Sequence, residues 1–91
     1  MNRWQVELKR KLGKRINKLP KNIQEKTAAL VNDLKANGVF PGKKWNNYSP
    51  LEGKKHHCHL TYSYVACWEE VDDKLRLIEV YYVGSREDAP Y

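Results

Sequence analysis

The densest cluster of titratable and charged side chains in the chain is Lys54-Lys55-His56-His57-Cys58-His59. If this segment is a strand, Lys55, His57 and His59 share one face and Cys58 points to the other. The two imidazoles would lie about 6–7 Å apart, a spacing that could bracket a phosphate. Because imidazole exchanges a proton near neutral pH, this face could bind a phosphate and move protons. Ordinary surface histidines remain the alternative.

A second candidate group follows the last apolar run of the chain. The guanidinium of Arg86 stays protonated, and its fork of N–H donors matches a phosphate, which suits it to transition-state stabilisation. Tyr82 and Tyr91 could stack on a base or donate a proton. The alternative for Arg86 is a surface ion pair with Glu87 or Asp88.

Metal binding and cysteine chemistry fit the spacing less well. His57 and Cys58 are adjacent, so on a strand they cannot easily reach one ion, and the chain has no CxxC motif. Cys67 lies in the apolar segment Val65-Ala66-Cys67-Trp68, which is typical of a buried, inert thiol. The sequence therefore predicts no metal and no cofactor.

The chain has 91 residues, a net charge of +6 and a pI of about 9.4. Such a charge attracts polyanions, of which nucleic acid is the commonest. A chain of this length predicts a single domain, residues 1–91, with one modest core, so chemistry should occur in an open groove or on a sheet face. No apolar stretch approaches the ~20 residues of a membrane span and no signal peptide is visible, so we expect a cytoplasmic protein.

Two helices are predicted in the first half of the chain. The first carries the apolar stripe Trp4, Leu8, Leu12, Ile16 and Leu19, although residues 4–8 also alternate as a short strand would. Its other positions are strongly basic and could contact a nucleic-acid backbone without reading sequence: Lys9, Arg10, Lys11, Lys14, Arg15 and Lys18. The second helix begins after Pro20 and ends at Asn37-Gly38.

The second half predicts a loop over residues 39–53 and then strands over residues 55–60, 64–71 and 75–83. The expected fold is α+β: two N-terminal helices, with or without a short strand before them, packed on one face of a small antiparallel sheet of three to four strands. The other face of the sheet would be available for function.

In these features the chain resembles the RelE/ParE toxins of bacterial toxin–antitoxin modules. The resemblance rests on segments in a fixed order: Lys18-Leu19-Pro20-Lys21, His57-Cys58-His59-Leu60, Val65-Ala66-Cys67-Trp68, and the tail from Ile78-Glu79-Val80 through Gly84-Ser85-Arg86-Glu87 to Ala89-Pro90-Tyr91. It implies a sheet with helices on one face and the active surface on the other. RelE-like members cut messenger RNA, mostly in the ribosomal A site. They need no metal: the 2′-hydroxyl attacks the adjacent phosphate and leaves a cyclic phosphate.

Carried over to this chain, the resemblance implies that Arg86 and Tyr91 are the family's arginine after the last strand and its C-terminal tyrosine. Lys55, His57 and His59 lie where RelE-like toxins place basic residues. The best-known member has a further arginine at the start of the following strand, where this chain has Ser63-Tyr64. A histidine is a reasonable general base, because its pKa lies near the working pH.

The expected function is therefore that of a toxin: a metal-independent endoribonuclease that cleaves mRNA on the ribosome and inhibits translation. The expected catalytic residues are Arg86, His57, His59 and Tyr91, and the expected RNA-binding residues are Lys43, Lys44, Lys54, Lys55 and Tyr82. The expected partners are a cognate antitoxin, mRNA and the ribosome, and no membrane. The alternatives are a ParE-like inhibitor of gyrase and a protein that binds nucleic acid or antitoxin without cleaving.

Overall fold

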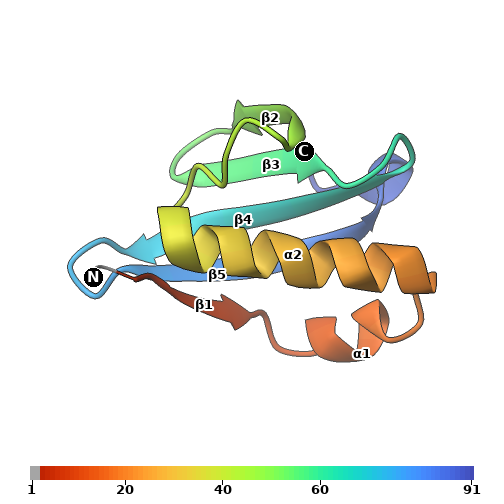
Figure 1. The fold of residues 1–91 in the computed structure, drawn as a ribbon, viewed down its shortest axis with the longest axis horizontal. Coiled ribbons are helices and arrows are strands. Elements are labelled where there is room, and N and C mark those ends of the chain that lie inside the picture. The colour runs from red at the N-terminus through yellow and green to blue at the C-terminus, as the bar shows by residue number, and fades with distance from the viewer. Residues whose placement is uncertain (1–2) are drawn as a thin grey trace.

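A computed structural model describes residues 3–91, and Figure 1 shows a long helix lying across a five-stranded sheet. The elements in chain order are β1 (Gln5–Leu8), α1 (Leu12–Ile16), α2 (Lys21–Asn37), β2 (Asn46–Pro50), β3 (Lys55–His59), β4 (Tyr64–Asp72), β5 (Leu77–Ser85) and a 3-10 turn, η1 (Arg86–Asp88). The strand order is β1-β5-β4-β3-β2. Strand β1 runs parallel to β5, and the other neighbours are antiparallel.

The predicted architecture is wrong in its N-terminal part. Residues 5–8, for which the sequence left a helix and a short strand open, form β1, which pairs with β5 from Gln5 opposite Leu77 to Leu8 opposite Val80. Lys11 then adopts a left-handed backbone conformation, with a φ of 75°, and α1 has only five residues. The chain therefore has one long helix and one short helix, not two comparable N-terminal helices.

The sheet also differs from the predicted one. It is mixed and five-stranded, where an antiparallel sheet of three to four strands was expected. Besides β1, the additional strand is β2, which lies within the predicted loop and pairs with β3 at Ser49 opposite His57. The fold is α+β overall. The three strands predicted in the second half coincide closely with β3, β4 and β5.

The core lies between α2 and one face of the sheet. Ile23, Leu30 and Leu34 project from α2 and are buried, as is Trp68 of β4, whose indole Nε1 donates a 2.9 Å hydrogen bond to the carbonyl of Val39. The helix α2 ends at Asn37-Gly38, as the sequence predicted, and Gly38 has a positive φ of 85°, which glycine adopts readily. Within residues 3–91, no helix is long and apolar enough to span a membrane.

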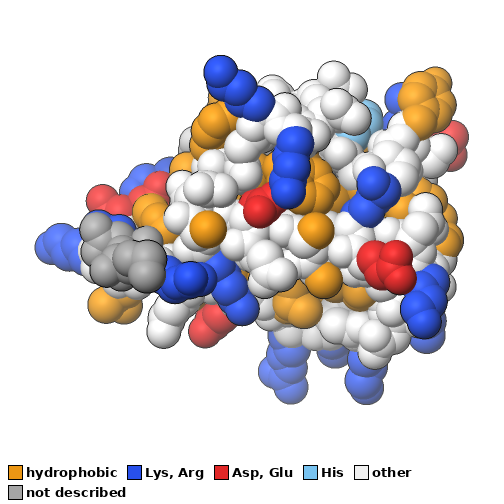
Figure 2. Space-filling model, in the orientation of Figure 1, with side chains coloured by type: hydrophobic (Ala, Val, Ile, Leu, Met, Phe, Trp, Pro, Cys, Tyr) orange, Lys and Arg blue, Asp and Glu red, His pale blue; other side chains and the backbone are white. Residues whose placement is uncertain are grey.

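Alternation along the strands separates the core from a second face of the sheet. Cys58, Ala66, Trp68 and Val80 belong to the core beneath α2. We call the opposite side of the sheet the open face. Figure 2 views the molecule from the α2 side, and Lys and Arg side chains project around its margin, including the lower edge below α1.

Candidate functional site

The open face carries the polar side chains of β3. Lys55, His57 and His59 alternate with the core residue Cys58 and so share the opposite face of β3. At the end of the strand, His59 also borders a pocket with Lys26 and Ala29 of α2. Their partners on β4 are Glu69, Cys67 and Val65, respectively. The ring centroids of His57 and His59 lie 5.8 Å apart, so the imidazoles are neighbours on one surface, as the strand alternation predicted.

His57 is the more enclosed of the two histidines, with 8% of its surface exposed. Its Nδ1 lies 3.3 Å from the backbone carbonyl oxygen of Ser49 on β2. The tautomer that satisfies this carbonyl carries its hydrogen on Nδ1 and leaves Nε2 as an acceptor. Burial lowers the pKa of His57, the hydrogen bond to Ser49 partly offsets this, and the charge of His59 lowers it further. A neutral imidazole with a free Nε2 can act as a general base.

Tyr91 lies directly against His57. The chain leaves β5 through η1 and returns over the open face, so that the ring centroids of His57 and Tyr91 are 4.5 Å apart. Figure 1 shows the C-terminus beside β3. Burial raises the pKa of Tyr91, the nearby Cys67 raises it further, and the positive charge of Arg86 acts in the opposite direction. Tyr91 therefore keeps its proton at neutral pH and can serve as a donor.

Arg86 begins η1, beyond the end of β5. Its backbone N–H donates to the carbonyl of Ser63, and its guanidinium carbon lies 4.4 Å from the ring centroid of Tyr62. Its Nη2 lies 3.4 Å from the Tyr62 hydroxyl. Tyr62 is 77% exposed, so the stacked pair stands in solvent at the β3–β4 turn. Within residues 3–91, Arg86 makes no ion pair, and its charge remains available to an anion.

The relation between Arg86 and the imidazoles follows from the strand register. His59 pairs with Val65, and Val65 pairs with Gly84, so these three residues form one row across β3, β4 and β5. Neighbouring strands are about 4.8 Å apart, which separates the His59 and Gly84 backbones by about 10 Å. Arg86 follows Gly84 by two residues. Arg86 is therefore at the same end of the sheet as His59, and its charge also reaches Tyr91.

A groove adjoins this cluster along the β3 side of the open face. Its walls include Lys54, Lys55, Tyr81, Pro90 and Tyr91, and its volume is about 590 Å³. The ammonium group of Lys55 lies 5.7 Å from the ring centroid of Tyr81. The lining also contains Glu52 and Glu69, which balance the charges of the two lysines. The feature of the groove that suits a single-stranded nucleic acid is therefore its pair of tyrosine rings, on which bases can stack.

The remaining candidates lie elsewhere or have internal partners. Lys44 forms a 3.0 Å ion pair with Asp33 of α2, on the helix side of the molecule. Lys43 is exposed in the segment before β2. The hydroxyl of Tyr82 donates a 2.6 Å hydrogen bond to the carbonyl of Ser85, while its ring borders a separate basic cleft. Lys44 also borders a pocket of about 240 Å³ that His59 lines, so the structure brings Lys44 near one imidazole, whereas Lys43 lines neither this pocket nor the groove.

His56 has a structural role. It points to the helix side, where its ring stacks on Tyr48 and Trp68, and its Nδ1 is 2.8 Å from the Tyr48 hydroxyl.

The thiols are not arranged for nucleophilic chemistry. Cys58 and Cys67 are fully buried, and burial raises their pKa values to about 12 and about 11. Among the described residues, no three His, Cys, Asp or Glu side chains are placed to hold a metal ion.

The sequence reasoning missed three contributors to the site. Ser49 orients His57 from a strand that was predicted as a loop. Tyr62, which the sequence analysis did not single out, stacks on Arg86 in solvent. Tyr81 borders the groove beside Lys55.

No family model matches the chain, and no curated protein is significantly similar to it. Among the solved structures that share its fold are the following three. The archaeal RelE–RelB complex from Pyrococcus horikoshii OT3 is 20% identical with a TM-score of 0.78, over 98% of this chain and 100% of that one. The E. coli DinJ–YafQ toxin–antitoxin complex is 14% identical with a TM-score of 0.60, over 98% and 99%.

The third is the conserved hypothetical protein HP0892 from Helicobacter pylori. It is 17% identical with a TM-score of 0.54, over 92% of this chain and 96% of that one. At these identities the similarity establishes the fold, and it confirms at that level the resemblance seen in the sequence. The chain therefore has the fold of the RelE-type toxins.

Proposed function

We propose that this chain is the toxin of a toxin–antitoxin module and an endoribonuclease that cleaves mRNA on the ribosome. The fold shared with proteins solved as RelE–RelB and DinJ–YafQ complexes supports the toxin role and an antitoxin partner. Ribonuclease chemistry rests on one observation above all. A buried His57, oriented by the Ser49 carbonyl, stands beside Tyr91 on the face that α2 leaves open.

The proposed reaction is transesterification within the RNA. Nε2 of His57 takes the proton of the 2′-hydroxyl, whose oxygen forms a bond to the adjacent phosphorus. The bond from phosphorus to the 5′-oxygen breaks, and the Tyr91 hydroxyl gives that oxygen its proton. The products are a 2′,3′-cyclic phosphate and a 5′-hydroxyl. Proton return from His57 to Tyr91, whose rings are in contact, restores both groups.

The cationic groups would act on the phosphate. Arg86 stabilises the negative charge that develops on the phosphorane, and His59 assists on the same side. Lys54 and Lys55 hold the RNA backbone in the groove next to Tyr91. No step in this scheme uses a metal or a cofactor.

Expression in bacteria tests the proposal. The parent should arrest growth, and primer extension should reveal discrete cuts within translated messages. Arg86→Ala should abolish arrest and cuts, whereas Lys18→Gln, an exposed change outside the site, should preserve both. Broken DNA with intact messages would instead indicate a gyrase inhibitor. Undiminished arrest by Arg86→Ala would refute the role of Arg86.

A further inference from the structure

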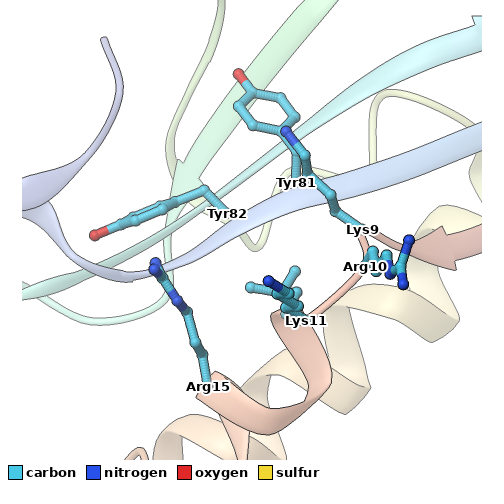
Figure 3. Close-up of a pocket in the computed structure, with 7 residues that line it drawn as sticks. Lys9, Arg10, Lys11, Arg15, Tyr81 and Tyr82 are labelled. Carbon is cyan, nitrogen blue, oxygen red and sulfur yellow. The ribbon is translucent and has the colours of Figure 1, made fainter.

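A second concave site lies next to the open face, between β5 and the segment that joins β1 to α1. It has a volume of about 280 Å³ and is lined by Lys9, Arg10, Lys11, Leu12, Arg15, Tyr81 and Tyr82. Figure 3 shows Lys9 and Arg15 extending towards Tyr81 and Tyr82 on β5, with Arg10 and Lys11 on the segment between them. We call this site the basic cleft.

The basic cleft concentrates positive charge without acidic neighbours in its lining. It contains four cations and no carboxylate. All four are exposed, and within residues 3–91 none of them forms an ion pair. Clustered like charges repel one another, and a concave surface raises the local potential. An anion with several charges relieves this repulsion and releases counterions when it binds.

The backbone holds these cations in place. The N–H of Lys9 donates a 2.8 Å hydrogen bond to the carbonyl of Val80, which ties the end of β1 to β5. Lys11 has a φ of 75°, which turns the chain sharply into α1. Lys9 and Arg15 therefore approach the tyrosines from two sides, as Figure 3 shows.

The tyrosines supply an aromatic wall. The hydroxyl of Tyr82 is fixed by its hydrogen bond to Ser85, which holds its ring beside Arg15. Burial raises the pKa of Tyr82, as does the charge of Asp88, and the positive charge of Arg15 acts against both. Fixed aromatic rings beside cations are the features with which proteins hold single-stranded nucleic acid.

The basic cleft and the groove described above are separate but share one lining residue. Tyr81 lines both, with Lys55 and Tyr91 on one side and Lys9 and Arg15 on the other. The path from His57 on β3 to the cleft crosses β4 and β5, at about 4.8 Å per strand. One extended strand of RNA can therefore occupy both sites.

We propose that the basic cleft binds backbone phosphates of the RNA whose scissile link lies at His57, several nucleotides away from the cut. This inference rests on the proposed function for the identity of the ligand. The cleft would position the RNA and read no sequence, because lysine and arginine bind phosphate oxygens alike in every nucleotide.

Binding of a single-stranded oligonucleotide with 2′-O-methyl sugars tests this assignment, since blocked 2′-oxygens prevent cleavage. The test variant is Lys9→Gln/Arg15→Gln, and the matched control is Lys18→Gln/Lys21→Gln, which removes the same charge from exposed positions that line none of the described sites. Loss of two phosphate contacts should reduce the slope of log affinity against log salt by about 1.4. The control should change the slope much less. Equal changes of the slope in the test and control variants would refute phosphate binding by the basic cleft.

Oligonucleotides of different length distinguish binding at the cleft from binding at the cleavage site. A dinucleotide at His57 is too short to reach the cleft, so its affinity should fall no more in the test variant than in the control. A larger loss with the dinucleotide would overturn the assignment. A hairpin RNA is the third probe: preferential loss of hairpin over single-strand binding would move the ligand to folded RNA and contradict the proposal.

Two further outcomes distinguish failure of the cleft assignment from failure of the ribonuclease proposal. If the parent binds no oligonucleotide, the cleft assignment and the ribonuclease proposal both fail. If the parent binds and only polyglutamate binding falls in the test variant, the cleft serves an acidic protein segment and this inference is overturned alone. Thermal unfolding should be unchanged in both variants, because the replaced side chains are exposed.

Discussion

At His57, burial and one hydrogen bond determine what the side chain can do. Burial keeps the imidazole neutral, and the Ser49 carbonyl selects the tautomer in which Nε2 is free. His59 and Tyr91 flank this ring on the same face. A histidine pair in the sequence could be an ordinary surface feature, whereas these contacts give one member a defined acceptor atom.

The lowered pKa of His57 predicts the acid limb of the cleavage rate. A general base acts only when unprotonated, so the rate should fall on acidification with a midpoint below the ordinary histidine value. His57→Gln should reduce the rate by about 10²–10⁴-fold and remove this limb. Single-turnover cleavage measured across acidic pH checks the prediction, and an unchanged limb in His57→Gln would assign it to another group.

The same shift predicts how stability depends on pH. Between the lowered pKa of folded His57 and the ordinary value near 6.5, the unfolded chain binds a proton that the folded chain does not. Stability should therefore fall as pH decreases through that window. His56 has a lowered pKa for the same reason, burial, and adds to the effect. Urea unfolding at neutral and acidic pH should show a weaker dependence in His57→Gln than in the parent.

Arg86 depends on Tyr62 for its position. An exposed cation over an aromatic ring contributes about 0.5–1 kcal/mol, so Tyr62→Ala should slow cleavage by about two- to fivefold. Tyr62→Phe retains the ring and should cleave at nearly the parental rate. Rates at saturating substrate would measure both. Equal losses in the two variants would show that the hydroxyl, not the ring, matters.

At the scale of elements, the packing of Tyr82 at the end of β5 requires a glycine at position 84. A Cβ at Gly84 would lie 2.8 Å from the Tyr82 hydroxyl, which is held by Ser85. Gly84→Ala should therefore cost about 1–3 kcal/mol of unfolding free energy, as overpacking does. Gly13→Ala in α1 is the control, because a Cβ there meets nothing within 4 Å. Urea midpoints of both variants test this, and equal stability would contradict the steric account.

The strands that were predicted correctly are those whose position can be recognised from neighbouring residues alone. In β3, β4 and β5, apolar and polar residues alternate and turns are short, so their positions could be predicted. The parallel pairing of β1 with β5 joins residues far apart in the chain and leaves no local signal. The apolar residues from Trp4 to Leu19 recur every three or four positions, as in one helix. A strand followed by a short helix can produce the same spacing, so the pattern was assigned to a single helix.

The candidate site was predictable to a similar extent. Alternation places Lys55, His57 and His59 on one face, and the structure has that arrangement. The path of the tail from Arg86 to Tyr91 depends on tertiary packing that no short pattern encodes. Lys44 was grouped with the RNA-binding residues, and no short pattern shows that Asp33 on α2 pairs with it. Lys44 borders a pocket with His59 and does not line the groove beside Tyr91.

At the scale of the whole molecule, the two faces of the sheet have different roles. One face of the sheet packs on α2 and supplies the stability, and the other presents imidazoles, tyrosines and lysines. The net charge of +6 favours encounter with a polyanion. The fold alone does not determine activity, since function depends on the residues that the open face carries.

Cleavage of ribosome-bound mRNA by purified protein tests the central claim most directly. The parent should produce cuts ending in a 2′,3′-cyclic phosphate, and a single 2′-deoxy sugar at the cut site should prevent them. Arg86→Ala should be slower by about 10²–10³-fold, as expected for the loss of one donor to a developing oxyanion. Full-rate cleavage of the 2′-deoxy message, or by a variant lacking both His57 and Arg86, would contradict the account.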